Sequence, residues 1–274
     1  MRISLGLFDT RSHSKICLHG FEGAVSKKRR GKRFMEYYMY IAMGIILLPA
    51  MIFSFVAQTK VNSNFKKYSK VESTAKKPAC VVAREILAKN GINDVVVKKI
   101  GGTLTDYYSD REKTVALSQD IYDSDSVSAI GIAMHEVGHA MQYASGYFPI
   151  KVRNLMVIVC NISSKLLWPL VFLGLIFDLG VAGGGVIGEV FLWSGIGFFG
   201  FSAFLNFVTL PVEYNASARA KEVISKEQLL TTQEKQMASK VLDSAALTYV
   251  AALMVSITNL LRFLIVVMSG RKRD

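Results

Sequence analysis

Cysteine, histidine and acidic residues are all scarce in this chain. Its 274 residues include only three cysteines (Cys17, Cys80 and Cys160), and these are scattered without CxxC spacing. This spacing excludes a disulfide framework and fits a reducing face for the soluble part of the protein. Only four histidines occur, so any imidazole chemistry has to come from very few positions.

Acidic residues number 21 against 33 lysines and arginines, and the imbalance is concentrated at one end. Residues 1–34 hold nine basic and two acidic residues, show no apolar periodicity, and end in a basic cluster at 27–30. We predict a basic disordered extension here, outside the native fold if Met35 is the natural start. Beside a membrane span, such a cluster favours anionic lipid, and no specific nucleic-acid partner is expected.

Long apolar runs are abundant, and they set the class of the protein. A transmembrane helix needs about 20 apolar residues, and four segments are long enough: 35–57, 155–177, 190–210 and 245–268. The glycine-rich stretch 178–189 lacks the strand and Lys-Ser/Thr pair of a phosphate-binding loop, so it is predicted to be a turn between antiparallel spans.

The segment 58–154 is predicted to be a small soluble unit. A helix follows Pro78 and ends before Gly91, and DVVVKKI predicts a strand. The residues on either side of 109–112 predict a β-hairpin. Serines and aspartates at 123–126 offer N-caps for a helix to about Ala144, along which apolar residues recur at helical spacing.

That last helix carries the motif AMHEVGHAMQ, in which His135 and His139 lie four residues apart. Residues i and i+4 share one helix face, so both imidazoles can reach one Zn²⁺, while Glu136 can reach a metal-bound water without ligating the metal. Two ordinary buried histidines are the alternative. However, this composition predicts only about 0.002 chance matches to HExxH, which favours a site.

A catalytic zinc usually has three protein ligands. His13 and His19 lie in the basic extension, so the third ligand is expected to be an acid on the same side of the membrane as the motif. Glu213 follows Pro211, which is predicted to start a fresh helix in the segment 211–244. Glu222 is the second choice, because it is grouped with Glu227 and Glu234 on a face that looks solvated.

The stretches HEVGHAMQ, LPVEYNASARA and LDSAALTYVAAL resemble the YugP-type membrane-bound zinc metallopeptidases, over about residues 35–268. This family is similar to the HtpX-like and CAAX-processing membrane peptidases. The resemblance implies that His135, His139 and Glu213 hold one zinc ion per chain. Related proteins commonly have an aspartate where this chain has Ser217, which could still hydrogen-bond a ligand histidine, though more weakly.

We therefore expect an α+β integral membrane protein with about four transmembrane helices and a small zincin-like catalytic unit, made of the HExxH helix and the hairpin. Its expected function is zinc-dependent endoproteolysis of membrane-associated proteins or peptides, with Glu136 as general base for a zinc-activated water. Tyr107, Tyr214 and Arg219 are candidate oxyanion donors, and the hairpin edge could bind an extended peptide.

Lysines after the first span, together with Lys151 and Arg153, predict a multi-pass protein of the cell membrane, in contact with its lipids, with a cytoplasmic active site. Arg271–Arg273 and the basic extension predict the opposite orientation. The alternative function is a catalytically inactive zinc-binding scaffold or chaperone, whose closed site could recruit Cys80 as a fourth ligand. A lipid or nucleic-acid tether through residues 1–34 is a further alternative.

Overall fold

The computed structural model describes residue 41 and residues 44–180 and 185–271. The predicted extension at 1–34 lies outside these residues. Contacts divide the chain into two units, Met1–Leu48 and Pro49–Asp274. The described part of the first unit is helical.

Helices and one small sheet alternate as the sequence predicts. The described elements are α2 (Ala79–Lys89), β1 (Val96–Ile100), β2 (Tyr107–Ser109), β3 (Thr114–Ser118), α3 (Gln119–Tyr122), α4 (Val127–Ala144), α5 (Phe148–Gly180), α6 (Gly185–Lys226) and α7 (Thr232–Arg271). Residues 44–68 form a further helix. The predicted helix after Pro78, the hairpin and the helix to Ala144 are thereby confirmed.

The sheet has the strand order β1-β3-β2. The hairpin strands β2 and β3 are antiparallel, with Tyr108 opposite Val115. β1 pairs in parallel with β3, with Val97 opposite Val115. All five residues of β3 are buried because this strand lies between the other two. The strand β2 is therefore left with one free edge.

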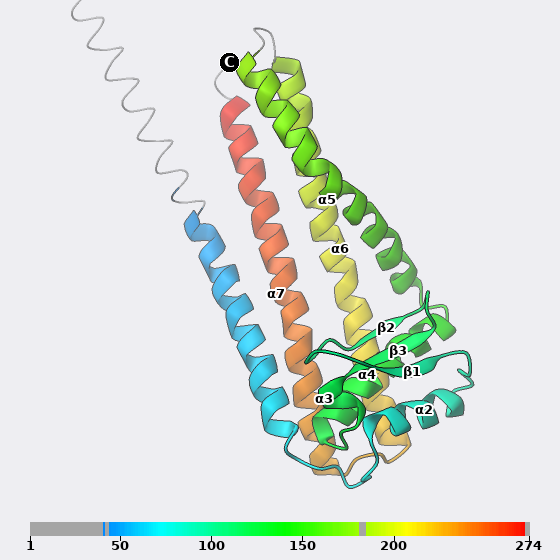
Figure 1. Cartoon of the computed structure of the whole chain (residues 1–274). Helices are drawn as coiled ribbons and strands as arrows, with labels where there is room; N and C mark the ends of the chain where they lie inside the picture. The colour runs from blue at the N-terminus through cyan, green and yellow to red at the C-terminus, as the bar shows by residue number, and fades with distance from the viewer. Residues whose placement is uncertain (1–40, 42–43, 181–184, 272–274) are drawn as a thin grey trace, which may run out of the picture. The chain divides into compact units, whose positions relative to one another are not determined.

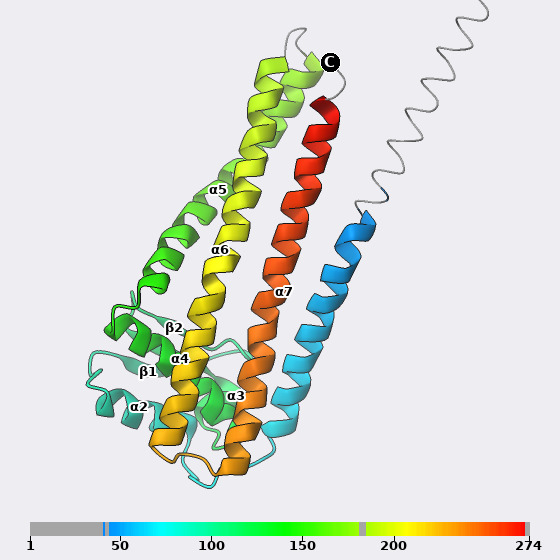
Figure 2. The same ribbon diagram turned by 180° about the vertical axis from the view of Figure 1, so that it is seen from behind.

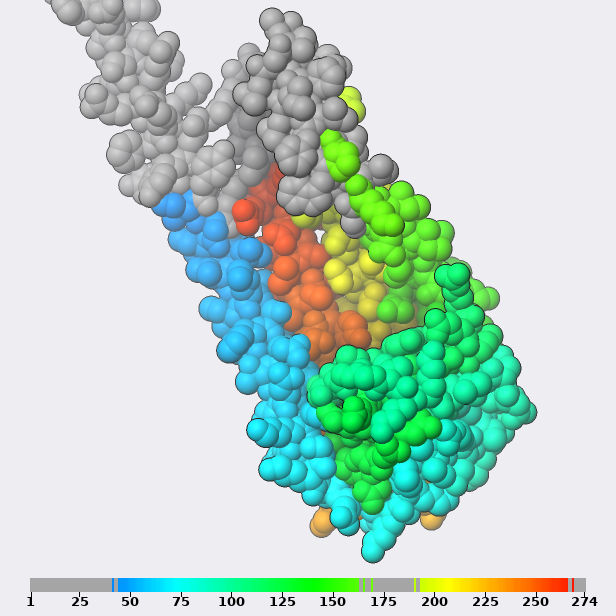
Figure 3. All heavy atoms as spheres, in the orientation of Figure 1, coloured from blue at the N-terminus to red at the C-terminus, as the bar shows by residue number. Residues whose placement is uncertain are grey.

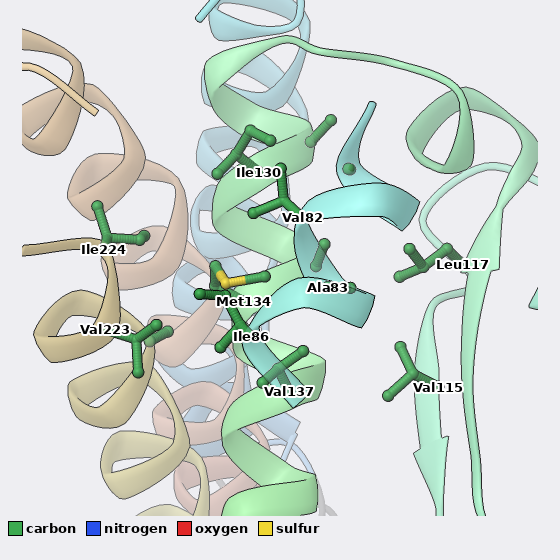
Figure 4. Close-up of a cluster of buried hydrophobic side chains, with 14 of the residues drawn as sticks. Val82, Ala83, Ile86, Val115, Leu117, Ile130, Met134, Val137, Val223 and Ile224 are labelled. Carbon is green, nitrogen blue, oxygen red and sulfur yellow. The ribbon is translucent and has the colours of Figure 1, made fainter. Parts of the chain in front are cut away.

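The apolar core of the soluble unit lies between α2, β3, α4 and α6 (Figure 4). Val82 and Ile86 from α2 meet Ile130 and Met134 from α4, and each is at most 1% exposed. Val223 and Ile224 extend this cluster onto α6. One buried helix, α4, is thus held from several sides, which fixes the direction of every side chain it carries.

The three long helices pack with α6 in the middle. α6 packs against both α5 and α7, and both ribbon views show it between them (Figures 1 and 2). In the space-filling view, the yellow atoms of α6 are recessed between those of α7 and α5 (Figure 3). The helix through residue 68 also contacts α7, where Asn64 Nδ2 donates to the carbonyl of Lys240.

Several predicted boundaries are wrong. Pro211 does not start a fresh helix, because α6 runs unbroken from 185 to 226 with Pro211 inside it. The predicted segment 211–244 is divided instead at residues 227–231, between α6 and α7. The predicted soluble segment 58–154 begins as helix up to Tyr68 and ends inside α5. Long helices that continue from the apolar runs into the neighbouring segments blur the composition change on which those boundaries relied.

In the described ranges, three helices are long and apolar enough to cross a membrane: Gly44–Tyr68, Trp193–Lys226 and Thr232–Ile265. They cover three of the predicted spans. The predicted span 155–177 lies within α5, a helix of 33 residues that contains Pro169. Four spans therefore stay a prediction, as does the zincin-like character of the soluble unit.

Candidate metal centre

α4 presents the two motif histidines on one face. The helix begins at Ser126, whose Oγ accepts a hydrogen bond from the amide of Ala129 and caps the first turn. Four-residue spacing brings the imidazoles of His135 and His139 together edge to face, with ring centroids 4.8 Å apart and an interplanar angle of 83°. Their side chains are only 15% and 11% exposed. Both rings are therefore held within the protein while remaining close to each other.

α6 brings Glu213 to the same point. Its Oε2 lies 3.2 Å from Nε2 of His135 and 3.5 Å from Nε2 of His139. One ligand atom from each of the three residues lies within 4.8 Å of the other two. Bonds of about 2.0–2.1 Å to a tetrahedral zinc place its ligand atoms about 3.3 Å apart. The two imidazoles and the carboxylate are zinc-type donors, and both distances from the carboxylate oxygen to the imidazole nitrogens are close to this value.

Gly138 makes this approach of α6 to α4 possible. A Cβ atom at residue 138 would lie 2.5 Å from the carbonyl oxygen of Ala216. A backbone oxygen cannot rotate away, so any larger residue at this position would force the two helices apart. The glycine of HEVGH is thus a packing requirement that places Glu213 within reach of the histidines.

Each imidazole has a hydrogen-bond partner on its other nitrogen. Nδ1 of His135 lies 3.1 Å from Oγ of Ser217, the contact expected from the sequence. Nδ1 of His139 lies 3.0 Å from Oε1 of Gln142, which is fully buried. Such partners fix ring orientation and leave Nε2 free to face the ligand position.

A cavity of about 140 Å³ opens beside these groups. Its lining combines the three candidate ligands with a carboxylate, phenols and a guanidinium: Asp106, Tyr107, Tyr108, His135, Glu136, His139, Tyr143, Ile150, Arg153, Glu213 and Tyr249. Arg153 reaches from α5 to within 3.9 Å of Oε1 of Glu213. Tyr107 and Tyr108 belong to the edge strand β2, so the strand borders the cavity.

A family model described as "putative neutral zinc metallopeptidase" matches residues 43–268. The chain belongs to this family. It is also 42% identical over 231 residues to the "Putative membrane protease YugP" of Bacillus subtilis (strain 168), an alignment that covers 84% of this chain and 98% of that protein. No solved structure matches the chain.

Membership of the zinc metallopeptidase family agrees with the donor set that α4 and α6 bring together. Within the described residues, this is the one group of three or more such side chains that could hold a metal. Glu222, the second choice for a ligand, lines a different cavity. Cys80 lies in the apolar core. Neither alternative ligand therefore belongs to the group.

Burial shifts the pKa values of several side chains around the cavity. It raises the pKa of Glu136; the positive charges of His135 and His139 oppose this shift, and the carboxylate of Glu213 adds to it. Burial alone would lower the pKa of His139, but its hydrogen bond to Glu213 and the nearby carboxylate charges leave that pKa raised. Burial also raises the pKa of Asp106, against the hydrogen bonds it accepts from Ser118.

Of the three candidate oxyanion donors predicted from the sequence, one lines the cavity. Tyr107 lines the cavity. Tyr214 is 48% exposed and does not line it. Arg219 donates instead to Asn215 and lines another cavity. Sequence reasoning missed Tyr249 and Arg153, which lie beside the motif only because α5 and α7 pack on the two sides of α6.

Gln142 was also missed, although a signal for it was present. It follows His139 by three residues, and this spacing puts its side chain on the histidine face of an otherwise apolar helix. Glu234 was expected on a solvated face, but it is 9% exposed. It accepts hydrogen bonds from the backbone amide and hydroxyl of Thr74 and from the amide of Thr231, which joins the start of α7 to the soluble unit.

Proposed function

We propose that this member of the neutral zinc metallopeptidase family is a membrane-embedded, zinc-dependent endopeptidase that hydrolyses membrane-associated proteins or peptides. One observation carries the proposal. His135, His139 and Glu213 present their ligand atoms within 4.8 Å of one another, and Glu136 lines the same cavity. A protease role also agrees with the printed name of the Bacillus relative.

In this mechanism, Nε2 of each histidine and a carboxylate oxygen of Glu213 hold one zinc ion. When bound, zinc polarises a water molecule and the scissile carbonyl. Glu136 does not serve as a ligand; it follows His135 directly, and its buried side chain faces the cavity. Its carboxylate accepts the proton of the attacking water and then donates it to the leaving amine, as a general base and then a general acid.

Donors are also needed for the negative charge that develops on the carbonyl oxygen. The phenol of Tyr249 and the guanidinium of Arg153 both line the cavity, from α7 and α5. The Nε of Arg153 is buried and has no hydrogen-bond partner. Hydrogen-bond donors that are already in place where charge develops stabilise the transition state strongly. Tyr249 and Arg153 therefore join Tyr107 as candidate donors.

The position of the cavity supports a substrate held at the bilayer surface. Strongly exposed apolar side chains on α6 include Phe201, Phe204 and Phe207. Glu213 follows Phe207 by six residues, which is about 9 Å along a helix. Tyr214, directly after Glu213, is also exposed, and tyrosine is enriched where proteins meet membrane interfaces. The scissile bond would then lie close to the headgroups.

We further propose that this face of the membrane is cytoplasmic. Lys60, Lys66, Lys67 and Lys70 are exposed at the soluble end of the first helix, as the positive-inside rule requires of a cytoplasmic segment. Arg153 supports this orientation less than the sequence suggested, because its side chain borders the cavity beside Glu213.

The test compares zinc content and proteolysis in detergent-purified protein. Wild type should hold about one zinc per chain and cleave a labelled, unstructured substrate such as casein. Glu213→Ala should lose the zinc. Glu136→Gln should keep it and lose about 10²- to 10⁴-fold of the turnover, the usual contribution of a general base.

Glu222→Gln is the matched control, because it alters an acid of the same helix outside the group of ligands. It should keep both zinc and activity. Full activity in Glu136→Gln would contradict the role of Glu136 as general base. A wild-type chain that holds zinc but cleaves no substrate would favour the scaffold alternative. Full zinc content in Glu213→Ala would show that another residue completes the site.

A further inference from the structure

Gln142 is a fully buried polar side chain beside the metal centre, and the mechanism above does not use it. Its amide makes three hydrogen bonds. Oε1 lies 3.0 Å from Nδ1 of His139, and Nε2 donates to the carbonyl of Val212 at 2.7 Å and to Oδ1 of Asn215 at 3.0 Å. No water can replace these partners at a site that is closed to solvent, so the amide can adopt only an orientation that satisfies all of them.

That orientation is determined by a series of hydrogen bonds in which some groups can only donate and others can only accept. Arg219 can only donate, and its Nε donates to Asn215 at 2.9 Å, so the atom it meets has to be the amide oxygen. This oxygen and the Val212 carbonyl can only accept, so Gln142 has to turn its NH₂ group toward them. Its own oxygen then faces His139, whose Nδ1 has to carry the hydrogen. In the neutral ring, the lone pair of Nε2 would then point toward the ligand position.

His135 has no comparable constraint. Its Nδ1 faces the hydroxyl of Ser217 at 3.1 Å. A hydroxyl can donate or accept, so this contact orients the ring without specifying which nitrogen is protonated. Of the two histidines, only His139 has an Nδ1 partner that requires a hydrogen on that nitrogen.

The residues that bind the Gln142 amide, directly or through Asn215, all belong to one stretch of α6, from Val212 to Arg219. This stretch also carries Glu213. The guanidinium of Arg219 is held in turn, 3.5 Å from the carbonyl of Met141 and over the ring of Tyr147. We propose that Gln142, Asn215 and Arg219 are positioning residues that fix the tautomer and direction of His139 toward zinc. This inference rests on the zinc site of the proposed function.

The test measures zinc affinity of the full-length, detergent-solubilised chain by competition with a chromogenic chelator. Loss of a hydrogen-bonding partner of a metal ligand typically weakens metal binding about 10- to 100-fold. Gln142→Leu should show a loss in that range, and Asn215→Leu a loss in the same direction. Asn215→Asp keeps an oxygen acceptor for both Gln142 and Arg219, so it should recover most of the affinity lost in Asn215→Leu.

Glu234→Gln is the control for general destabilisation. Glu234 is also a buried, multiply hydrogen-bonded side chain, but it lies at the start of α7 and outside the group of ligands. This variant should lower the melting temperature and leave zinc affinity unchanged. If Gln142→Leu does not fold, the comparison of Asn215→Leu with Asn215→Asp decides.

Unchanged zinc affinity in Gln142→Leu, or equal losses in the two Asn215 variants, would overturn the inference and leave the proposed function intact. If the Gln142 and Asn215 variants show the expected zinc affinities but the wild-type chain cleaves no peptide, only the proposed function would be rejected. A wild-type chain that takes up no zinc would reject both.

Discussion

One face of α4 packs Ile130 and Met134 against the apolar side chains of α2, whereas another face presents His135, His139 and Gln142 to polar groups of α6. The apolar face requires volume, and several hydrophobic residues of similar size could supply it. The polar face requires particular atoms at particular distances. A single helix therefore has one face that tolerates substitutions of similar size and one face that does not. Substitutions on the apolar face should lower stability, whereas substitutions on the polar face should also weaken zinc binding.

The largest effect is expected where the polar face depends on backbone contact. Gly138→Ala should separate α4 from α6, because the new Cβ would meet the carbonyl of Ala216 at 2.5 Å. We expect about 3 kcal/mol of destabilisation, the upper end of overpacking costs, together with loss of zinc as Glu213 moves away. Thermal unfolding and zinc content measure the two effects.

Gly131→Ala provides the matched control on the same helix. Its Cβ would lie 3.4 Å from the Cβ of Ala238, an ordinary contact. Since alanine favours a helix over glycine by up to about 1 kcal/mol, this variant should be neutral or slightly stabilised and should keep its zinc. If both glycine variants behaved alike, the close approach at Gly138 would not be what builds the site.

On the apolar face, a loss of stability without a loss of zinc is expected. Ile86 is 1% exposed and belongs to the core cluster. Ile86→Ala should cost about 2–5 kcal/mol, through lost burial and the cavity left behind. Zinc affinity, measured at a temperature where the variant is folded, should stay within about twofold of wild type. A parallel loss of affinity would mean that the two faces are not separable.

The smallest effect is expected at Ser217, which contacts His135 without setting its tautomer. Ser217→Ala should weaken zinc binding by at most about tenfold, the lower limit for such partners, and by less than Gln142→Leu. Chelator competition on both variants gives the ranking. The reverse order would assign the main positioning role to His135.

Local sequence patterns predicted the elements that local chemistry determines. Pro78 and Gly91 bracket α2, and alternation on either side of residues 109–112 gives the hairpin. The motif itself led to His135 and His139, and Glu213 followed from the choice of an acid on the same side of the membrane. The structure brings these three side chains together; that they hold zinc stays a prediction.

Features that depend on distant parts of the chain could not be predicted. The parallel pairing of β1 with β3 and the arrival of Tyr249 at the cavity both follow from tertiary packing. Pro211 misled because proline usually interrupts a helix. A long apolar helix packed between neighbours can accommodate the missing hydrogen bond, so α6 continues through it. The series of hydrogen bonds from Gln142 to Arg219 joins residues more than 70 positions apart in the sequence, and no local pattern reveals it.

The continuity of α6 joins a candidate metal ligand to an apolar stretch long enough to cross a membrane. One uninterrupted helix contains a stretch apolar enough to cross a bilayer and also carries Glu213, Asn215 and Ser217. Apolar helices tilt when the bilayer is thinner than their hydrophobic length. A tilt of α6 would displace the carboxylate of Glu213 relative to the two imidazoles of α4, so the geometry of the candidate ligands depends on how this helix lies in its surroundings.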